Sequence, residues 1–403
     1  MNLKPRPFYL EKLLAFKDSE FIKVLVGMRR CGKSSLLHLF ADHLKTSGVA
    51  EDHIVMMNFE AADFLEIDDH KKLLDHLHSL LDQKPSPEKH YLLLDEIQLV
   101  DQWEKAVNAL RLRDDVDIYL TGSNAYLLSS QLATLLSGRY VEIEIYPLSF
   151  KEFVSFIGEA VPTSKTLDRF TTYGGLPPVV EQNDDVSLAQ TVLSGIYNTV
   201  LVKDIAQYTQ IRNQAIFADI ASFIADTTGS SVSITNIEKK LASANRKTAN
   251  ETIERYIQSL VDAFLLYRAR RYNLRGKALL QGLEKYYYAD LGIRNMLLGF
   301  PAGNYGYVLE NLVHNELLVR GYSVQVGKLD ALEIDFVAQR NDEVLYVQAC
   351  ASLLEETTRK REIAPLQKID DLRGKKIIIT YDTVGTGMTG NIEIVSVLDW
   401  LMR

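Results

Sequence analysis

The residues most able to do chemistry form a short motif near the amino end of the chain. Residues 27–34 read Gly-Met-Arg-Arg-Cys-Gly-Lys-Ser and fit the pattern G-x-x-x-x-G-K-[ST]. Its glycines let successive backbone N–H groups turn inward around phosphate oxygens, and the amino end of a following helix adds partial positive charge. We therefore predict a phosphate-binding loop (P-loop); the alternative is a glycine-bearing turn with an exposed lysine. The residues expected to bind the nucleotide are Gly27, Arg29, Arg30, Cys31, Gly32, Lys33, Ser34 and Ser35.

A pair of acids supplies the second part of this predicted site. Residues 91–96 read Tyr-Leu-Leu-Leu-Asp-Glu, an apolar strand that ends in two carboxylates. In a site that hydrolyses nucleotides, Lys33 reaches the β- and γ-phosphates, while the Ser34 hydroxyl and Asp95 hold Mg²⁺. Glu96 then lies beside the attacking water and acts as its base. The alternative interpretation is a buried strand whose terminal acids face solvent.

Two further polar residues are candidates for the catalytic site. Asn124 follows the strand-like residues 118–121, and ligands of open α/β sheets bind at the carboxyl ends of strands. We predict that Asn124 senses the γ-phosphate or holds the water; the alternative is a helix cap. Arg139 is predicted to neutralise transition-state charge as an arginine finger, and the alternative is pairing with local acids. The sequence leaves open whether Arg139 acts in its own subunit.

Alternating apolar and amphipathic stretches predict the elements that position these residues. Strand-like runs recur through the first 150 residues, with helical patterns at 34–44 and 103–112 between them. Strands that alternate with helices indicate βαβ units and a mainly parallel sheet, and hence an α/β fold. The predicted strands are residues 22–26, 54–58, 91–95, 118–121 and 140–145.

Composition excludes several classes of protein. The 403 residues are 47% hydrophobic and 24% charged, which is typical of globular domains and not of collagen, coiled coils or disordered chains. Cys31 and Cys350 are too few for a disulfide framework or a cysteine zinc cluster, and they suit a reducing compartment. No signal peptide is evident, and the uncharged run 118–138 is too polar to cross a bilayer. We therefore predict a soluble, cytoplasmic protein.

The middle of the chain carries a local excess of basic residues, although the net charge of the whole chain is −8. Residues 201–280 hold 12 basic and 7 acidic side chains, and their predicted order of helices and strands resembles a winged helix-turn-helix. Basic side chains at the turn, the recognition helix and the wing predict contacts with DNA phosphates. The alternative is a solvated face, or a docking surface for the acidic amino-terminal domain. The basic residues between 239 and 277 are Lys239, Lys240, Arg246, Lys247, Arg255, Arg268, Arg270, Arg271, Arg275 and Lys277.

From about residue 305 onward, the predicted order is helix, three strands, helix and strand, which resembles the core of restriction endonucleases. That core needs an acid on the first helix, an Asp on the second strand and Glu-x-Lys on the third, because carboxylates hold Mg²⁺ and a lysine stabilises charge. Glu310 and Asp335 match the first two places, but the third reads Gln348-Ala349-Cys350. Gln348 is neutral and Cys350 supplies no cation at pH 7. We therefore predict a degenerate core without nuclease activity.

Taken together, these motifs resemble one family: bacterial and archaeal AAA-type ATPases close to the STAND ATPases, joined to a C-terminal domain of unassigned function. The resemblance covers nearly the whole chain, and it implies ATP rather than GTP as the nucleotide. The motifs that resemble the ATPase part are residues 27–35, 92–98, 121–124, 138–140 and 147–150. Those that resemble the companion domain are residues 174–177, 290–294, 309–311 and 333–336.

These observations predict one main function and four domains. The function is ATP binding with slow Mg²⁺-dependent hydrolysis, in which the nucleotide state switches domain packing or the binding of a protein partner at the C-terminal domain. The alternatives are an ATP-responsive regulator that binds DNA and, less favoured, a DNA-cleaving defence protein. The oligomeric state is open. The predicted domains are a P-loop ATPase domain (1–148), a helical lid or linker (149–210), a winged-helix-like domain (211–290) and a degenerate restriction-endonuclease-like domain (291–403).

Overall fold

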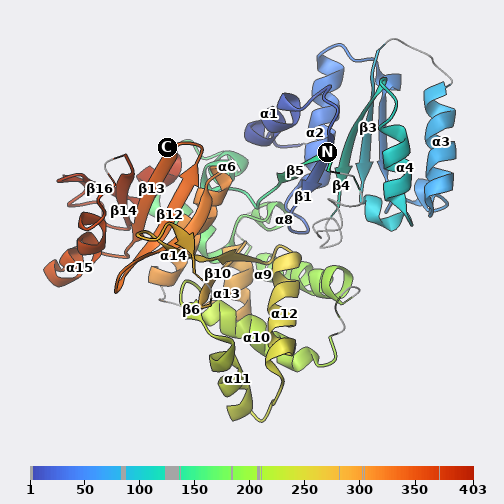
Figure 1. Ribbon diagram of the computed structural model, residues 1–403. Helices are drawn as coiled ribbons and strands as arrows, with labels where there is room; N and C mark the ends of the chain where they lie inside the picture. Colours follow the sequence, from blue (N-terminus) through green and yellow to red (C-terminus); the bar gives the residue numbers. More distant parts are fainter. Residues whose placement is uncertain are drawn as a thin grey trace. The chain divides into compact units, whose positions relative to one another are not determined.

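The structure is a computed structural model that describes residues 3–82, 88–122, 136, 138–182, 185–206, 209, 211–280, 282–301, 303, 305–371 and 373–403. The chain forms two compact units, Met1–Tyr146 and Pro147–Arg403. Each unit has its own sheet or sheets (Figure 1). Each also has its own buried apolar side chains. The finer division into four domains stays a prediction.

The first unit is built on a five-stranded sheet whose strand pairings are all parallel. Every residue of its three central strands is buried, as expected for apolar strands covered on both faces. The predicted α/β fold and parallel sheet are thus confirmed. In sheet order the strands are β2 (Ile54–Asn58), β3 (His90–Asp95), β4 (Val116–Thr121), β1 (Ile22–Val26) and β5 (Tyr140–Glu144). Among its described residues, the helices of this unit are α1 (Pro7–Ala15), α2 (Lys33–Thr46), α3 (His70–Asp82) and α4 (Trp103–Leu110), with 3-10 turns η1 (Glu51–His53), η2 (Ala62–Phe64) and η3 (Ile97–Leu99).

The second unit begins with a group of helices. A capping box starts the first of them, because the Ser149 hydroxyl accepts the backbone N–H of Glu152 and the Glu152 carboxylate accepts the N–H of Ser149. These helices are α6 (Phe150–Ile157), α7 (Ser164–Tyr173), α8 (Pro177–Val180) and α9 (Val186–Thr199), and α9 continues into a π-helical segment, η5 (Val200–Ile205).

Two of the family-like motifs of the second unit pack directly on each other. The backbone N–H of Gly175 donates to Asp290 Oδ2 at 2.7 Å, and a Cβ added at Gly174 would lie 2.2 Å from Asp290 Oδ1. A Cβ added at Gly292 would lie 2.1 Å from the Tyr173 carbonyl oxygen. Close approach therefore requires glycine at both positions, and the two motifs contact each other directly.

The basic middle of the chain forms helices and a three-stranded antiparallel sheet, in the order β6-β10-β7. The predicted winged helix-turn-helix stays a proposal, and one part of it differs from expectation. The sequence pattern predicts one continuous strand over residues 265–272, but the structure divides it near Arg270, so that β7 and β8 belong to different sheets. The elements are α10 (Gln214–Asp226), β6 (Ser231–Val232), α11 (Ile234–Ser243), α12 (Asn250–Asp262), β7 (Leu266–Ala269), β8 (Arg271–Asn273), β9 (Ala278–Leu279), β10 (Glu284–Tyr288) and α13 (Leu291–Leu297).

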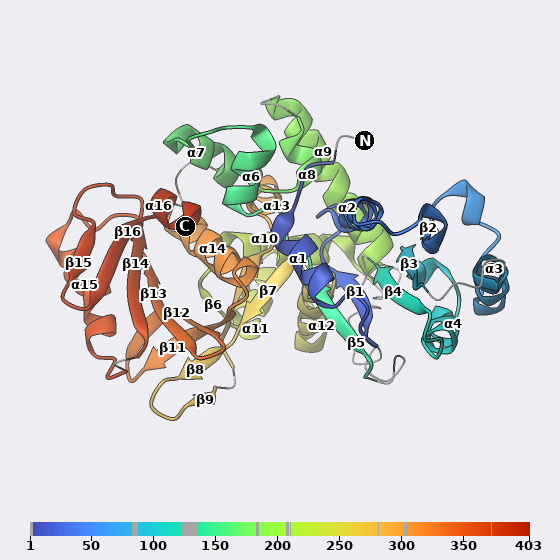
Figure 2. The same ribbon diagram turned by 90° about the horizontal axis from the view of Figure 1, so that it is seen from above.

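The carboxy-terminal part is an eight-stranded mixed sheet in the order β15-β16-β14-β13-β12-β11-β8-β9. Alternate residues along its strands enter two separate hydrophobic clusters, one with α14 and α16 and the other with α15, so these helices cover opposite faces (Figure 2). The elements are α14 (Tyr305–Val319), β11 (Ser323–Leu329), β12 (Leu332–Arg340), β13 (Glu343–Ala349), α15 (Glu356–Gln367), β14 (Lys375–Thr380), β15 (Gly387–Thr389), β16 (Ile392–Ser396) and α16 (Val397–Met402). Among the described residues, no helix is long and apolar enough to cross a membrane.

Candidate nucleotide-binding site

The predicted P-loop connects β1 to α2, at the carboxyl edge of the sheet. Gly27 has φ +140°, and a Cβ added there would lie 2.2 Å from the carbonyl oxygen of Ile145, so this position accepts only glycine. Gly32 precedes α2 with φ +106°, and Lys33 begins the helix. The buried Lys33 ammonium donates to the carbonyl oxygens of Gly27 at 2.8 Å and Met28 at 3.0 Å. The loop thus holds a cation against its own backbone.

The acid pair predicted from the sequence stands beside this loop. Ser34 Oγ donates to Asp95 Oδ1 at 3.0 Å, and the Thr121 hydroxyl donates to the same oxygen. Burial raises the pKa of Asp95, while the hydrogen bonds from Thr121 and Ser34 oppose the rise. The structure therefore brings a hydroxyl and a carboxylate together at the place where Mg²⁺ would be held.

Glu96 has a backbone conformation that is uncommon for its residue type. Its φ is +55°, and its N–H donates to Thr121 Oγ1 at 3.1 Å. The Gln98 amide donates to Glu96 Oε2. Left-handed backbone at a non-glycine residue is costly and is often retained at functional sites. Thr121 and Gln98 thus fix the two acids.

Sequence reasoning missed Thr121 and Gln98. The register of β3 against β4 pairs Leu94 with Leu120, so the next residues, Asp95 and Thr121, end neighbouring strands together. A hydroxyl at the carboxyl end of the strand beside the acid pair is the signal that would have identified Thr121.

The remaining P-loop residues differ in their surroundings. Cys31 is fully buried, and burial raises the pKa of its thiol. The Arg29 guanidinium lies 3.8 Å from the Glu60 carboxylate, whereas Arg30, with φ +67°, is exposed. Ser35 is also exposed, on the first turn of α2. Their predicted contacts with nucleotide stay predictions.

Asn124 and Arg139 are the two further residues predicted to be catalytic. Asn124 lies outside the described residues. Arg139 is exposed and precedes β5, and its carbonyl oxygen accepts the N–H of Ile22 at the amino end of β1. The P-loop follows the other end of β1, about 13 Å away at roughly 3.3 Å per strand residue. Within one chain, the backbone of Arg139 thus lies at the opposite end of β1 from the P-loop, and its role as an arginine finger stays a prediction.

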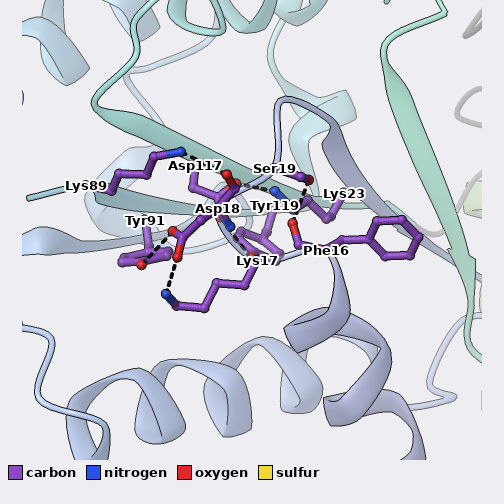
Figure 3. A network of polar contacts seen from close by, with 9 residues as sticks. All are labelled: Phe16, Lys17, Asp18, Ser19, Lys23, Lys89, Tyr91, Asp117 and Tyr119. Carbon is purple, nitrogen blue, oxygen red and sulfur yellow. Dashed lines mark hydrogen bonds and ion pairs between the residues drawn. The ribbon is translucent and has the colours of Figure 1, made fainter.

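A polar network fixes the opposite, amino-terminal edge of the same sheet (Figure 3). Lys23 of β1 and Asp117 of β4 form a fully buried ion pair, and Tyr119 donates to Asp117 Oδ2 at 3.1 Å. The N–H of Asp18 donates to the same oxygen at 2.9 Å, and the Tyr91 hydroxyl donates to Asp18 Oδ1 at 2.9 Å. Removing one member of a buried pair typically costs about 3–5 kcal/mol because the other charge is left uncompensated. This network aligns the strands that carry the P-loop and the acid pair.

The second unit contains its own cluster of buried charges. Lys285 Nζ of β10 lies 2.9 Å from Glu310 Oε1 and 2.9 Å from Glu333 Oε1. Tyr287 donates to Glu310 Oε1 at 2.8 Å. The sequence argument that this core has no fixed cation is therefore wrong, because Lys285 supplies one from a strand outside the predicted core.

Asp335 and Gln348, which the sequence analysis also singled out, form hydrogen bonds in the same region. The Gln348 side chain accepts the N–H of Asp335 at 2.7 Å and donates to Glu362 at 2.9 Å. Burial and the neighbouring Glu310 raise the pKa of Asp335 to about 8. Burial raises the pKa of the Cys350 thiol to about 11, so it supplies no charge. Within the described ranges, no group of three or more His, Cys, Asp or Glu residues is arranged to hold a metal ion.

Many side chains of the basic segment are engaged by acids. Arg268 lies 3.1 Å from Glu284, Arg275 lies 2.6 Å from Asp330, and Arg246 pairs with Asp219. Arg271 lies in β8, which pairs with β11 of the eight-stranded sheet (Figure 2). DNA binding by this segment stays a prediction.

Comparison with known proteins agrees with the geometry of the first unit. Residues 19–154 match the model of the AAA domain, and residues 164–304 match a domain of unknown function. An uncharacterized protein of Haemophilus influenzae is 43% identical over 99% of this chain and 98% of its own length. The chain belongs to the same family. An uncharacterized protein of Methanocaldococcus jannaschii is 32% identical to this chain, over 90% of this chain and 83% of its own length.

A solved structure supports the family's fold. The Walker-type ATPase PABY2304 of Pyrococcus abyssi aligns with 73% of this chain and 95% of its own, with a TM-score of 0.51 and 16% identity. At that identity the likeness concerns the fold alone. The first unit of this family member is thus an AAA-type nucleotide-binding domain by its matched domain and its parallel sheet.

Proposed function

We propose that this protein binds ATP and hydrolyses it slowly with Mg²⁺, and that its nucleotide state controls the packing or partner binding of the second unit. The observation that carries the proposal is the meeting of the P-loop with Asp95 and Glu96 at one sheet edge. The Ser34 hydroxyl and the Asp95 carboxylate, 3.0 Å apart, are hard oxygen ligands of the kind that suit Mg²⁺. When bound, Mg²⁺ neutralises charge on the β- and γ-phosphates.

In the proposed reaction, each group has one task. Lys33 exchanges its two carbonyl partners for phosphate oxygens, since both kinds of acceptor suit an ammonium group. Glu96 takes the proton of a water that attacks the γ-phosphorus, and the bond from that phosphorus to the bridging oxygen breaks to leave ADP and phosphate. Turnover is slow because Gln98 holds Glu96 and because Arg139 of the same chain lies at the other edge of the sheet.

The binding step is tested by replacing the loop lysine. Lys33→Ala should weaken the affinity for a fluorescent ATP analogue by roughly 10–100-fold, because it removes a charged hydrogen-bond donor worth about 1.5–3 kcal/mol. Lys45→Ala is the matched control, since Lys45 lies on the same helix and pairs with Glu51 on the surface. Equal affinities for the wild type and Lys33→Ala would exclude this loop as the nucleotide site.

A second candidate function rests on the exposed basic side chains of residues 239–277. Four of these side chains are exposed: Lys239 on α11, Lys247 between α11 and α12, Arg255 on α12, and Lys277 between β8 and β9. An ATP-responsive DNA-binding regulator would use such residues for phosphate contacts. The ion pairs of Arg246, Arg268 and Arg275 reduce the positive charge available, so this function ranks second.

A further inference from the structure

One buried arginine connects the P-loop with the junction between the two units. Arg6, the residue before α1, is only 4% exposed. Its Nη1 donates to the carbonyl oxygen of Cys31 at 2.9 Å, and its Nη2 donates to the carbonyl oxygen of Tyr146 at 3.0 Å. Cys31 belongs to the P-loop, and Tyr146 is the last residue of the first unit. A single guanidinium thus bonds both to the P-loop and to the last residue of the first unit.

The Tyr9 side chain holds the other backbone polar group of Tyr146, its N–H. The backbone N–H of Tyr146 donates to the Tyr9 hydroxyl at 3.2 Å. The Arg6 guanidinium lies 4.4 Å from the centroid of the Tyr9 ring, so the two anchors also pack on each other. The backbone of Tyr146 is therefore fixed from both sides by α1 and the residue before it.

The loop also touches the end of β5 directly. The N–H of Ile145 donates to the carbonyl oxygen of Val26 at 2.8 Å, and the missing side chain of Gly27 makes room for the Ile145 carbonyl. A shift of the P-loop backbone therefore acts on residues 145 and 146 by two routes, of which only the Arg6 bridge depends on a side chain.

The connection from Tyr146 to the second unit is short. Pro147 separates it from Leu148, whose side chain is 2% exposed in the hydrophobic core of the second unit and whose N–H donates to Gly175 at 2.8 Å. Proline restricts its own φ to about −65°. One residue of restricted conformation thus lies between an anchor on the first unit and an anchor in the second.

We propose that Arg6 is a positioning residue through which phosphate binding at the P-loop strengthens the anchoring of Tyr146, so that nucleotide occupancy governs the junction. A guanidinium that donates to two carbonyl groups responds to a displacement of either one, since hydrogen bonds weaken steeply with poor geometry. Phosphate charge at the loop also favours a nearby fixed cation. The inference rests on the proposed nucleotide binding.

The test is hydrogen exchange of the full chain, with and without ATP and Mg²⁺, in the hydrolysis-deficient Glu96→Gln background. ATP should slow exchange both in the P-loop peptide and in a junction peptide spanning residues 144–149, the latter by about tenfold, the equivalent of one charged hydrogen bond. In Arg6→Lys the cation is kept, but one ammonium cannot reproduce the fork that spans two carbonyl groups. That variant should keep the protection of the P-loop and lose that of the junction.

Each outcome has a separate meaning. Unprotected P-loop amides in the starting protein would refute nucleotide binding itself. Protected loop amides with an equal junction response in Arg6→Lys would overturn the role of Arg6. Tyr9→Phe provides a second variant, because it removes the acceptor of the Tyr146 N–H and leaves Arg6 in place. It should reduce the junction response, and an unchanged response there would also count against the bridge.

Discussion

Single residues at the sheet edge determine what the acid pair can do. Thr121 donates to Asp95 and accepts the N–H of Glu96 at 3.1 Å, so one hydroxyl orients both acids. Gln98 holds the Glu96 carboxylate. The sequence predicted both acids, because an apolar strand ending in carboxylates is a local pattern. It did not predict Thr121, because the contact depends on the pairing of two strands that are distant along the chain.

The clearest residue-scale prediction concerns Asp335. Its folded pKa of about 8 exceeds the ordinary value of 3.8, so between those values the native state holds a proton that the unfolded chain has lost. Stability of the second unit should therefore fall as pH rises through this window, by at most about 1.4 kcal/mol per pH unit. Asp335→Asn should flatten that dependence, because an amide does not ionise.

The two tryptophans make this measurable in the full chain. Trp103 lies in the first unit and Trp400 in the second, so urea unfolding in a Trp103→Phe background reports the second unit. The exposed Asp342→Asn serves as the control and should keep the wild-type slope between pH 5 and 8. The groups that face Asp335 are Glu310, Lys285 and Glu362. An equally steep slope in Asp335→Asn would contradict the assignment.

At the scale of elements, the P-loop depends on how closely β5 approaches it. Gly27→Ala should abolish nucleotide binding and lower stability, because its Cβ would overlap the Ile145 carbonyl at 2.2 Å. Gly48→Ala is the matched control, since Gly48 also has positive φ, +95°, but has open space around it. The control should lose only about 1–2 kcal/mol of unfolding free energy and bind nucleotide normally. Comparable nucleotide affinities for the two variants would show that the close contact is unimportant.

The basic elements permit a direct test of DNA binding. If they contact duplex DNA, affinity should fall with salt by about 0.9 logarithmic units per phosphate contact for each tenfold rise in salt. The triple variant Arg246→Glu, Lys247→Glu and Arg271→Glu should then lose DNA binding and keep ATP affinity. The triple variant Lys71→Glu, Lys72→Glu and Lys105→Glu changes the net charge equally in the first unit and serves as the control. Salt-independent binding, or binding unaffected by the triple change, would exclude the DNA interpretation.

Element boundaries in the first unit follow from local patterns, and the sequence predicted its five strands closely. The boundaries of short strands in the second unit could not be predicted from local patterns. Residues 265–272 read as one strand, but the structure divides them, and Arg271 pairs with Val326 across a parallel ladder. Such a change of sheet is set by distant partners rather than by residue type.

At the scale of the whole molecule, contacts between distant motifs explain more than each motif alone. Gly175 meets Asp290, and Lys285 meets Glu310, in both cases joining separate stretches of the second unit. No spacing rule in the sequence indicates either pair. Because Lys285 supplies a cation to this cluster, the prediction of no nuclease activity now rests on the neutral Gln348, which stands where that core needs an acid.

Phosphate release by the Glu96→Gln full chain tests most directly whether the first unit hydrolyses ATP with Glu96 as the base. The amide keeps the shape of the side chain but cannot take the proton of the attacking water. Turnover should therefore fall by about 100-fold or more, the usual contribution of a general base, while the affinity for ATP stays at the wild-type value. Phosphate release at the wild-type rate by Glu96→Gln would show that Glu96 is not the base.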